Sequence, residues 1–223
     1  AVVTTLGKVI FGMALALLVN QRFHGVNYMR TVFFLPAVLN NVAVGLVFRS
    51  MMHPSGLINQ TLSAMGLDML MHNWLTDAKI AIFSCAFVEI WKWTGYTMVI
   101  FLAALKGVSQ DLYEAASIDG AGKWTQFFKI TVPLITPVIF YNLITQLCQA
   151  FQEFNGPFLV TKGGPNGATT LISVLIYNNA FLRHKMGMAS AQAWVLFIIV
   201  CALTGIAFVS QKKWVYYSDE DGR

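Results

Sequence analysis

The chain has 223 residues, of which 57% are hydrophobic and 11% are charged. Soluble domains usually carry about 25% charged residues, so this chain has too few charges to cover a water-facing surface. The formal net charge is +5, but the basic residues are thinly spread and lie mostly at the ends of apolar blocks. That placement argues against a nucleic-acid-binding patch and favours a membrane protein.

Five apolar blocks come near the roughly 20 residues that a helix needs to cross a hydrocarbon core. They cover residues 2–20, 31–50, 80–105, 133–151 and 188–210. The second block is interrupted by Pro36 and by the pair Asn40 and Asn41. We therefore predict an all-α, polytopic transmembrane helix bundle with five spans, forming a single domain over residues 1–223.

The basic residues of the connections predict how the spans are oriented. With five spans, the segments 21–30, 105–132 and 211–223 lie on one side, and they carry Arg22, Arg30, Lys106, Lys123, Lys129, Lys212 and Lys213. The positive-inside tendency makes that side cytoplasmic, together with the C-terminus. The cluster Arg183, His184 and Lys185 on the other side weakens the contrast.

The positions of the cysteines and histidines argue against a metal site or a catalytic site. Cys85, Cys148 and Cys201 lie inside apolar blocks without CxxC spacing, which supports neither a zinc site nor a disulfide framework. The four histidines lie outside the predicted spans and form no HExxH motif, and no GxxxxGK[ST] phosphate loop is present. We expect no enzyme activity, no catalytic residue and no metal or cofactor in this chain.

The longest predicted cytoplasmic connection, residues 105–133, has a helical pattern. Asp111 is expected to cap a helix that begins at Leu112, supported by Glu114 three residues after the cap. Gly120 and Gly122 are expected to end or bend it. A second short helix should follow, and its aromatic face suits the membrane interface: Trp124, Phe127 and Phe128.

This connection resembles the EAA motif of ATP-binding-cassette (ABC) importer permeases. The matching residues are Glu114, Ala115, Ala116, Gly120, Ile130 and Pro133, with Val132 where leucine is usual. The sequences RTVFFLP (30–36), IWKWTG (90–95) and TKGGP (161–165) resemble the carbohydrate-uptake branch, of the maltose and glycerol-phosphate type. Members usually have six spans, so the resemblance implies that one N-terminal span is missing, and we expect the chain to be a fragment or a truncated natural protein.

The resemblance implies a coupling role for the connection. The residues expected to contact or position the ATPase are Glu114, Ala115, Ala116, Asp119, Gly120 and Gly122. Implied partners are a second homologous permease, two cytoplasmic ATPase subunits that bind ATP and Mg²⁺, an extracytoplasmic solute-binding protein, membrane lipid and a saccharide substrate. The plainer alternative is an ordinary amphipathic connection.

Two spans carry polar side chains at helical spacing, which suggests faces turned into the bundle or a wet cavity. One set is Asn142, Gln146, Gln149 and Glu153; the other is Glu89, Lys92, Trp93 and Tyr96. Such groups suit a sugar pathway. Alternatively, Glu89 and Lys92 form a structural ion pair, and the first set makes interhelical hydrogen bonds. Asn40 and Asn41 either satisfy backbone groups at a kink or line the cavity.

The leading hypothesis is a cell-membrane permease subunit of an ATP-driven importer for sugars or oligosaccharides. A glycerol-phosphate cargo is the alternative within this class, with Lys92 as its only intramembrane cation. An autonomous secondary transporter or channel is a second class, and uptake that survives without an ATPase would favour it. The sequence does not name the sugar.

Overall fold

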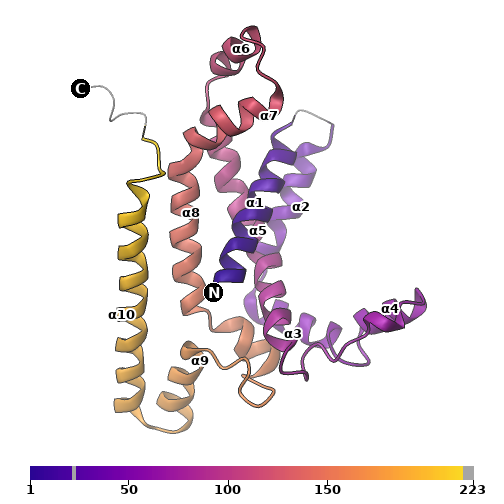
Figure 1. The fold of residues 1–223 in the computed structure, drawn as a ribbon. Coiled ribbons are helices and arrows are strands. Elements are labelled where there is room, and N and C mark those ends of the chain that lie inside the picture. Colours follow the sequence, from indigo (N-terminus) through magenta and orange to yellow (C-terminus); the bar gives the residue numbers. More distant parts are fainter. Residues whose placement is uncertain (22–23, 218–223) are drawn as a thin grey trace.

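The computed structural model describes residues 1–21 and 24–217, and these residues form helices without any strand (Figure 1). The α-helices, in chain order, are α1 (Val2–Asn20), α2 (Val26–Val38), α3 (Asn41–Met51), α4 (Leu57–Ala64), α5 (Ala81–Gly107), α6 (Gln110–Ile118), α7 (Lys123–Gln126), α8 (Val132–Gln152), α9 (Ile172–Tyr177) and α10 (Met186–Gln211). A 3-10 turn, η1, covers Asp68–Leu70, and three π-helical turns are η2 (Phe127–Thr131), η3 (Pro157–Thr161) and η4 (Asn178–Leu182).

Four of the five predicted spans correspond to the single long helices α1, α5, α8 and α10, with ends within about two residues of the prediction. By length and hydropathy, α1, α10 and the run Lys123–Thr161 can each cross a membrane, and the bent pair α2–α3 makes a fourth if it counts as one span. α5 has 27 residues and packs against α1, α2 and α8. The all-helical, multi-pass architecture is confirmed, while the count of five stays a prediction.

The described parts of the three predicted cytoplasmic segments lie at the same end of the bundle. The end of α1, the α6–α7 segment and the end of α10 are together in Figure 1, and α4 and α9 lie at the opposite end. This is the alternation that five crossings require. Arg22 falls outside the described residues, so its part in the charge argument stays a prediction.

The second predicted span is not a continuous helix. α2 and α3 meet at an angle of 95°, and the break falls at Leu39 and Asn40. Pro36 lies inside α2, one turn before this break. The Asn40 side chain accepts a hydrogen bond of 2.8 Å from the Val42 N–H and so caps α3. Asn40 therefore satisfies backbone at the bend, which was one of the two predicted alternatives.

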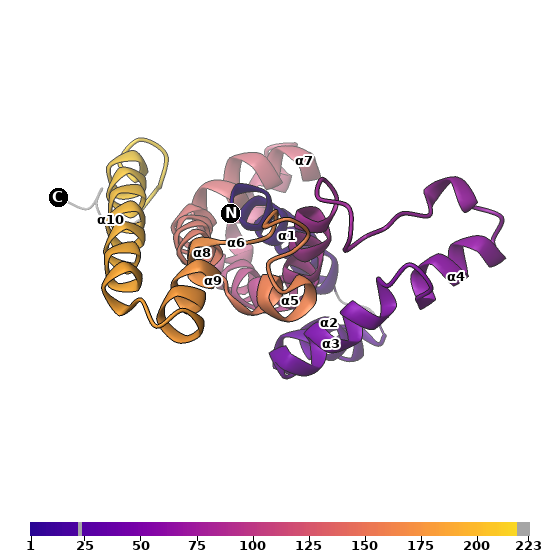
Figure 2. The ribbon, with the colours of Figure 1, turned by 90° about the horizontal axis from the view of Figure 1, so that it is seen from below.

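α5 lies at the centre of the bundle, and small residues let its neighbours approach closely. The main apolar core is formed by α1, α5 and α8, with Val9, Ala16, Met98, Phe101 and Ile135 among its buried residues. A Cβ built on Gly95 of α5 would lie 1.9 Å from the backbone oxygen of Phe33 in α2. α10 is different, because Ala189 is its one buried residue, and it stands at the edge of the bundle (Figure 2).

The Gly95 contact predicts that Gly95→Ala separates α2 from α5. A methyl group cannot fit 1.9 Å from a carbonyl oxygen, so α2 must shift, and we expect a loss of about 1–3 kcal/mol in stability. The measurement is thermal unfolding of the purified protein in detergent. Gly205→Ala in α10 is the control, because its Cβ would meet nothing within 4 Å. Equal melting temperatures for the two variants would contradict this packing.

Candidate functional site

The predicted coupling segment begins with a helix whose cap differs from the prediction. α6 starts at Gln110, and the Ser109 hydroxyl accepts a 3.3 Å hydrogen bond from the Asp111 N–H. The expected cap at Asp111 is therefore wrong. Ser109 has the extended backbone that a cap requires, with φ −61° and ψ 138°, whereas Asp111 already lies in the first helical turn.

Gly120 ends α6, as predicted. Its φ is +78°, a left-handed conformation that glycine adopts without a steric penalty. The Gly120 N–H donates to the Ser117 carbonyl at 3.1 Å, and the Ala121 N–H donates to the Ala116 carbonyl at 2.8 Å. These two bonds form a Schellman motif, which satisfies carbonyls at the helix end. Gly122 follows as the N-cap residue of α7, in an extended conformation.

The second short helix is not a separate element. α7, η2 and α8 follow one another without a gap from Lys123 to Gln152. The hydroxyls of Tyr113 in α6 and Thr131 in η2 are 2.7 Å apart, and the Gln126 amide donates to the Ser117 hydroxyl at 2.9 Å. α6 is therefore tied through side chains to the beginning of the α8 run.

The surface of α6 is open for contact. Glu114, Ala115 and Asp119 are exposed, and Ala116 is half-buried. Apolar side chains are exposed beside them, with Ile118 87% and Trp124 77% exposed. The Trp124 ring stacks on Phe128 with a centroid distance of 6.2 Å. The predicted coupling positions are thus accessible, and their contact with an ATPase stays a prediction.

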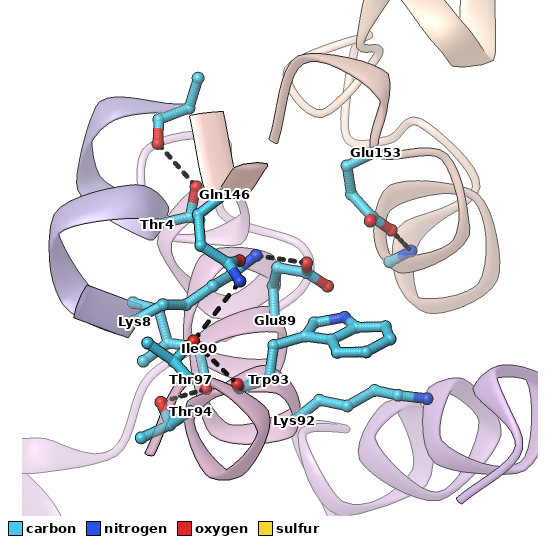
Figure 3. Close-up of polar contacts among 12 residues, drawn as sticks. Thr4, Lys8, Glu89, Ile90, Lys92, Trp93, Thr94, Thr97, Gln146 and Glu153 are labelled. Atoms are coloured by element: carbon cyan, nitrogen blue, oxygen red, sulfur yellow. Dashed lines mark hydrogen bonds and ion pairs between the residues drawn. The ribbon is translucent and has the colours of Figure 1, made fainter. Parts of the chain in front are cut away.

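Glu89 is paired with a lysine that the sequence analysis overlooked. The Lys8 ammonium on α1 donates to a Glu89 carboxylate oxygen at 2.7 Å, and Lys8 has no exposed surface (Figure 3). The predicted Glu89–Lys92 ion pair is therefore wrong, and Lys92 is not the only intramembrane cation. Lys8 could have been found from its position inside a 19-residue apolar helix, because a charge there needs a partner.

Lys92 points to the bend between α2 and α3. Its ammonium donates to the Leu39 backbone oxygen at 2.7 Å and also to the Asn41 side-chain oxygen. The Leu39 carbonyl lies where α2 ends and no helical N–H follows to bind it. Lys92 thus fixes the α2–α3 bend onto α5, and Asn41 takes part in this contact.

The polar residues of α8 separate into two groups. Asn142 and Gln146 are fully buried; the Asn142 amide donates to the Val138 carbonyl at 3.1 Å, and the Gln146 amide donates to the Thr97 hydroxyl at 3.4 Å. Gln149 is exposed, and Glu153 is half-buried just past the end of α8. The Asn142 bond stays within α8 and the Gln146 bond crosses to α5, so the predicted single face is part buried and part accessible, with Gln146 as its interhelical contact.

Glu153 and Glu89 line one cavity of about 190 Å³ at the Ala1 end of α1. A Glu153 carboxylate oxygen accepts a 2.8 Å hydrogen bond from the Gly156 N–H. Figure 3 shows the Trp93 ring between Glu89 and Lys92, on the side that faces Glu153. Trp93 packs edge-on against Tyr96 with centroids 6.2 Å apart. The structure thus places two carboxylates on one cavity, while the Trp93–Tyr96 pair lies outside the lining of that cavity.

Together these features define a multi-pass membrane permease with an exposed helix at one end. The family described as "binding-protein-dependent transport system inner membrane component" matches residues 8–213. The chain belongs to this family, and the predicted resemblance to ABC importer permeases is confirmed. It is therefore a membrane component of a binding-protein-dependent ABC transport system.

Similar proteins include named sugar permeases. The chain is 36% identical over 214 residues to the probable ABC transporter permease protein YesP of Bacillus subtilis (strain 168), covering 95% of this chain and 69% of YesP. It is 34% identical over 201 residues to the lactose transport system permease protein LacF of Rhizobium radiobacter, covering 89% of this chain and 67% of LacF.

A solved structure of a bacterial ABC transporter involved in the import of the acidic polysaccharide alginate has a similar fold. Its TM-score is 0.83 at 25% identity, over 94% of this chain and 77% of that chain. A second structure is of a bacterial alginate ABC transporter in complex with a periplasmic protein bound to an alginate pentasaccharide. Its TM-score is 0.84 at 25% identity, over 95% of this chain and 75% of that chain.

The buried ion pair predicts strong coupling between Lys8 and Glu89. Either Glu89→Gln or Lys8→Met alone leaves a buried group without its partner, and we expect each to lower stability by about 3–5 kcal/mol. The double variant removes both charges, so its loss should be much smaller than the sum. Unfolding in detergent measures all three variants. Strictly additive losses would show that the two charges do not interact.

Proposed function

We propose that this chain forms part of the translocation pathway of an ABC importer for sugars or oligosaccharides. The observation that carries the proposal is the link between α6 and α8, because it joins an exposed helix at one end of the bundle to a helix that bears polar side chains. The named sugar permeases among its relatives support a saccharide cargo. In this proposal the bundle end with α6 and the C-terminus is cytoplasmic.

The proposed assembly needs partners for its energy and for its cargo. Two ATPase subunits bind ATP and Mg²⁺ and receive the α6 helix through Glu114, Ala115, Ala116, Asp119, Gly120 and Gly122. A second homologous permease completes the pathway, and an extracytoplasmic solute-binding protein delivers the saccharide. The small alanines let a partner surface approach the α6 backbone closely, which supports the docking role.

The proposed coupling follows the side-chain contacts of α6. When the ATPases close on ATP, a displacement of α6 is passed to η2 through Tyr113 and Thr131, which lie 2.7 Å apart. η2 continues directly into α8, so α8 moves with it. Gln149 and Glu153, at the far end of α8, then change their position relative to α5, and the pathway switches its opening.

The accessible polar groups are the proposed cargo contacts. Gln149 and Glu153 offer hydrogen-bonding groups for sugar hydroxyls, and Trp93 or Tyr96 offers an aromatic face for a pyranose ring. Asn142 and Gln146 are fully buried, and the bond from Gln146 to Thr97 supports an interhelical role for Gln146. Glu89 and Lys92 hold α1 and the α2–α3 bend onto α5, so their proposed contribution to the pathway is indirect.

The coupling proposal predicts a large effect of Gly120→Val. Residue 120 has φ +78°, where a β-branched side chain is strained, so the end of α6 must rearrange. We expect cargo-stimulated ATP hydrolysis and uptake to fall at least about tenfold in proteoliposomes that contain the whole transporter. Gly107→Val is the control, since its Cβ would meet no atom within 4 Å and its backbone is helical.

Unchanged uptake and unchanged cargo-stimulated ATP hydrolysis in Gly120→Val would overturn the coupling role of α6. Uptake by the permease without any ATPase would instead favour an autonomous transporter. Membrane insertion of the variant is measured alongside, so that a missing protein is not mistaken for an uncoupled one.

A further inference from the structure

Four ionisable side chains project near the candidate pathway, and they are Lys8, Glu89, Lys92 and Glu153 (Figure 3). Lys8 and Glu89 bind each other at 2.7 Å, with side chains 0% and 10% exposed. A third charged group could use this lysine only by breaking a buried pair, which is strongly unfavourable. Lys8 therefore cannot serve as an anion-binding group.

Lys92 is occupied as well. It is 5% exposed, and its ammonium binds the Leu39 backbone oxygen and the Asn41 side chain at the α2–α3 bend. In Figure 3 its side chain leaves α5 on the far side of the Trp93 ring from Glu89. Lys92 is also not among the residues that line the 190 Å³ cavity. Its charge is used to hold the bend.

Glu153 remains as the charged group of the pathway without a cation. The Lys8–Glu89 pair is the one ion pair within residues 1–21 and 24–217, so Glu153 is held there by backbone N–H groups, such as that of Gly156, and by no ion pair. The cavity that it shares with Glu89 is otherwise lined by apolar and small residues, and its lining includes no lysine or arginine. The two ammoniums close enough to interact with the Glu153 charge, those of Lys8 and Lys92, are already bound to Glu89 and to the Leu39 backbone oxygen. An acidic ligand would therefore meet a carboxylate and no ammonium that is free to bind it.

We infer that the cargo of this permease is an uncharged saccharide, and that Glu153 disfavours acidic sugars and sugar phosphates. The inference rests on the proposed saccharide pathway. A carboxylate or phosphate that leaves water needs charged or N–H donors, and these lysines do not supply them. Sugar hydroxyls, in contrast, can donate to Glu153. The similar solved transporter imports an acidic polysaccharide, so this chain should differ from it in cargo charge.

The first experiment uses the whole transporter with its binding protein in proteoliposomes. Two probe pools are compared: neutral oligosaccharides from starch, xylan and galactomannan, and acidic ones from alginate and pectate. We expect the neutral pool to stimulate ATP hydrolysis and uptake at least about tenfold more than the acidic pool. A greater response to the acidic pool overturns the inference, whereas a response to neither pool overturns the proposed function itself.

The second experiment tests Glu153 with one matched pair of probes. A neutral oligosaccharide that is transported is compared with its derivative oxidised to a carboxylate at one C6. With the same binding protein, Glu153→Lys should raise the acidic-to-neutral uptake ratio at least about fivefold, and Glu153→Gln should raise it less. Lys162→Gln is the control, because exposed Lys162 lies outside the cavity lining. An unchanged ratio in both Glu153 variants overturns the role of Glu153.

Discussion

The arrangement of this bundle depends on how two lysines are satisfied in a medium that cannot solvate them. A charge in the hydrocarbon region must find a partner, so Lys8 brings α1 against α5 at Glu89. Lys92, one turn further along α5, brings the bend of α2 and α3 to the same helix. α5 thus carries two separate polar contacts that fix three neighbouring helices. Close backbone approaches at Gly95 and Gly12 are possible because these contacts set the register.

The α6 segment obeys a different constraint: most of its residues are exposed, and its proposed coupling role needs a defined shape rather than a buried charge. Local hydrogen bonds supply that shape: Ser109 caps α6, Gly120 ends it, and Tyr113 fixes it to Thr131. The result is a helix fixed at both ends, on which Glu114 and Ala115 are exposed, as the proposed coupling role requires. A flexible connection with the same sequence length would lose the displacement before it reached α8.

The sequence predicted what depends on composition and local spacing. Four long helices, the role of Gly120 and the family could be read from apolar blocks and from one motif. Which polar side chains pair across two helices could not be predicted from composition and local spacing. Glu89 lies three residues from Lys92, which suggested a local pair, yet the two side chains leave α5 in different directions. Pro36 and the Asn40–Asn41 pair indicated a kink in the second apolar block, but its angle of 95° could not be predicted, since it depends on contacts with other helices such as that of Lys92.

The contacts of α8 explain why this helix is suited to move. Its amide oxygens Asn142 Oδ1 and Gln146 Oε1 are buried and have no hydrogen-bond partner within the described residues. A buried acceptor left unsatisfied costs about 1–3 kcal/mol, so the α5–α8 contact is held less firmly than the α1–α5 contact with its ion pair. A displacement that enters through α6 should therefore repack α8 against α5, while α1, α2 and α5 move together. In the proposed pathway the polar stripe of α8 would then serve two purposes along one helix: a loosely bonded contact at Asn142 and Gln146, and the proposed cargo contacts at Gln149 and Glu153.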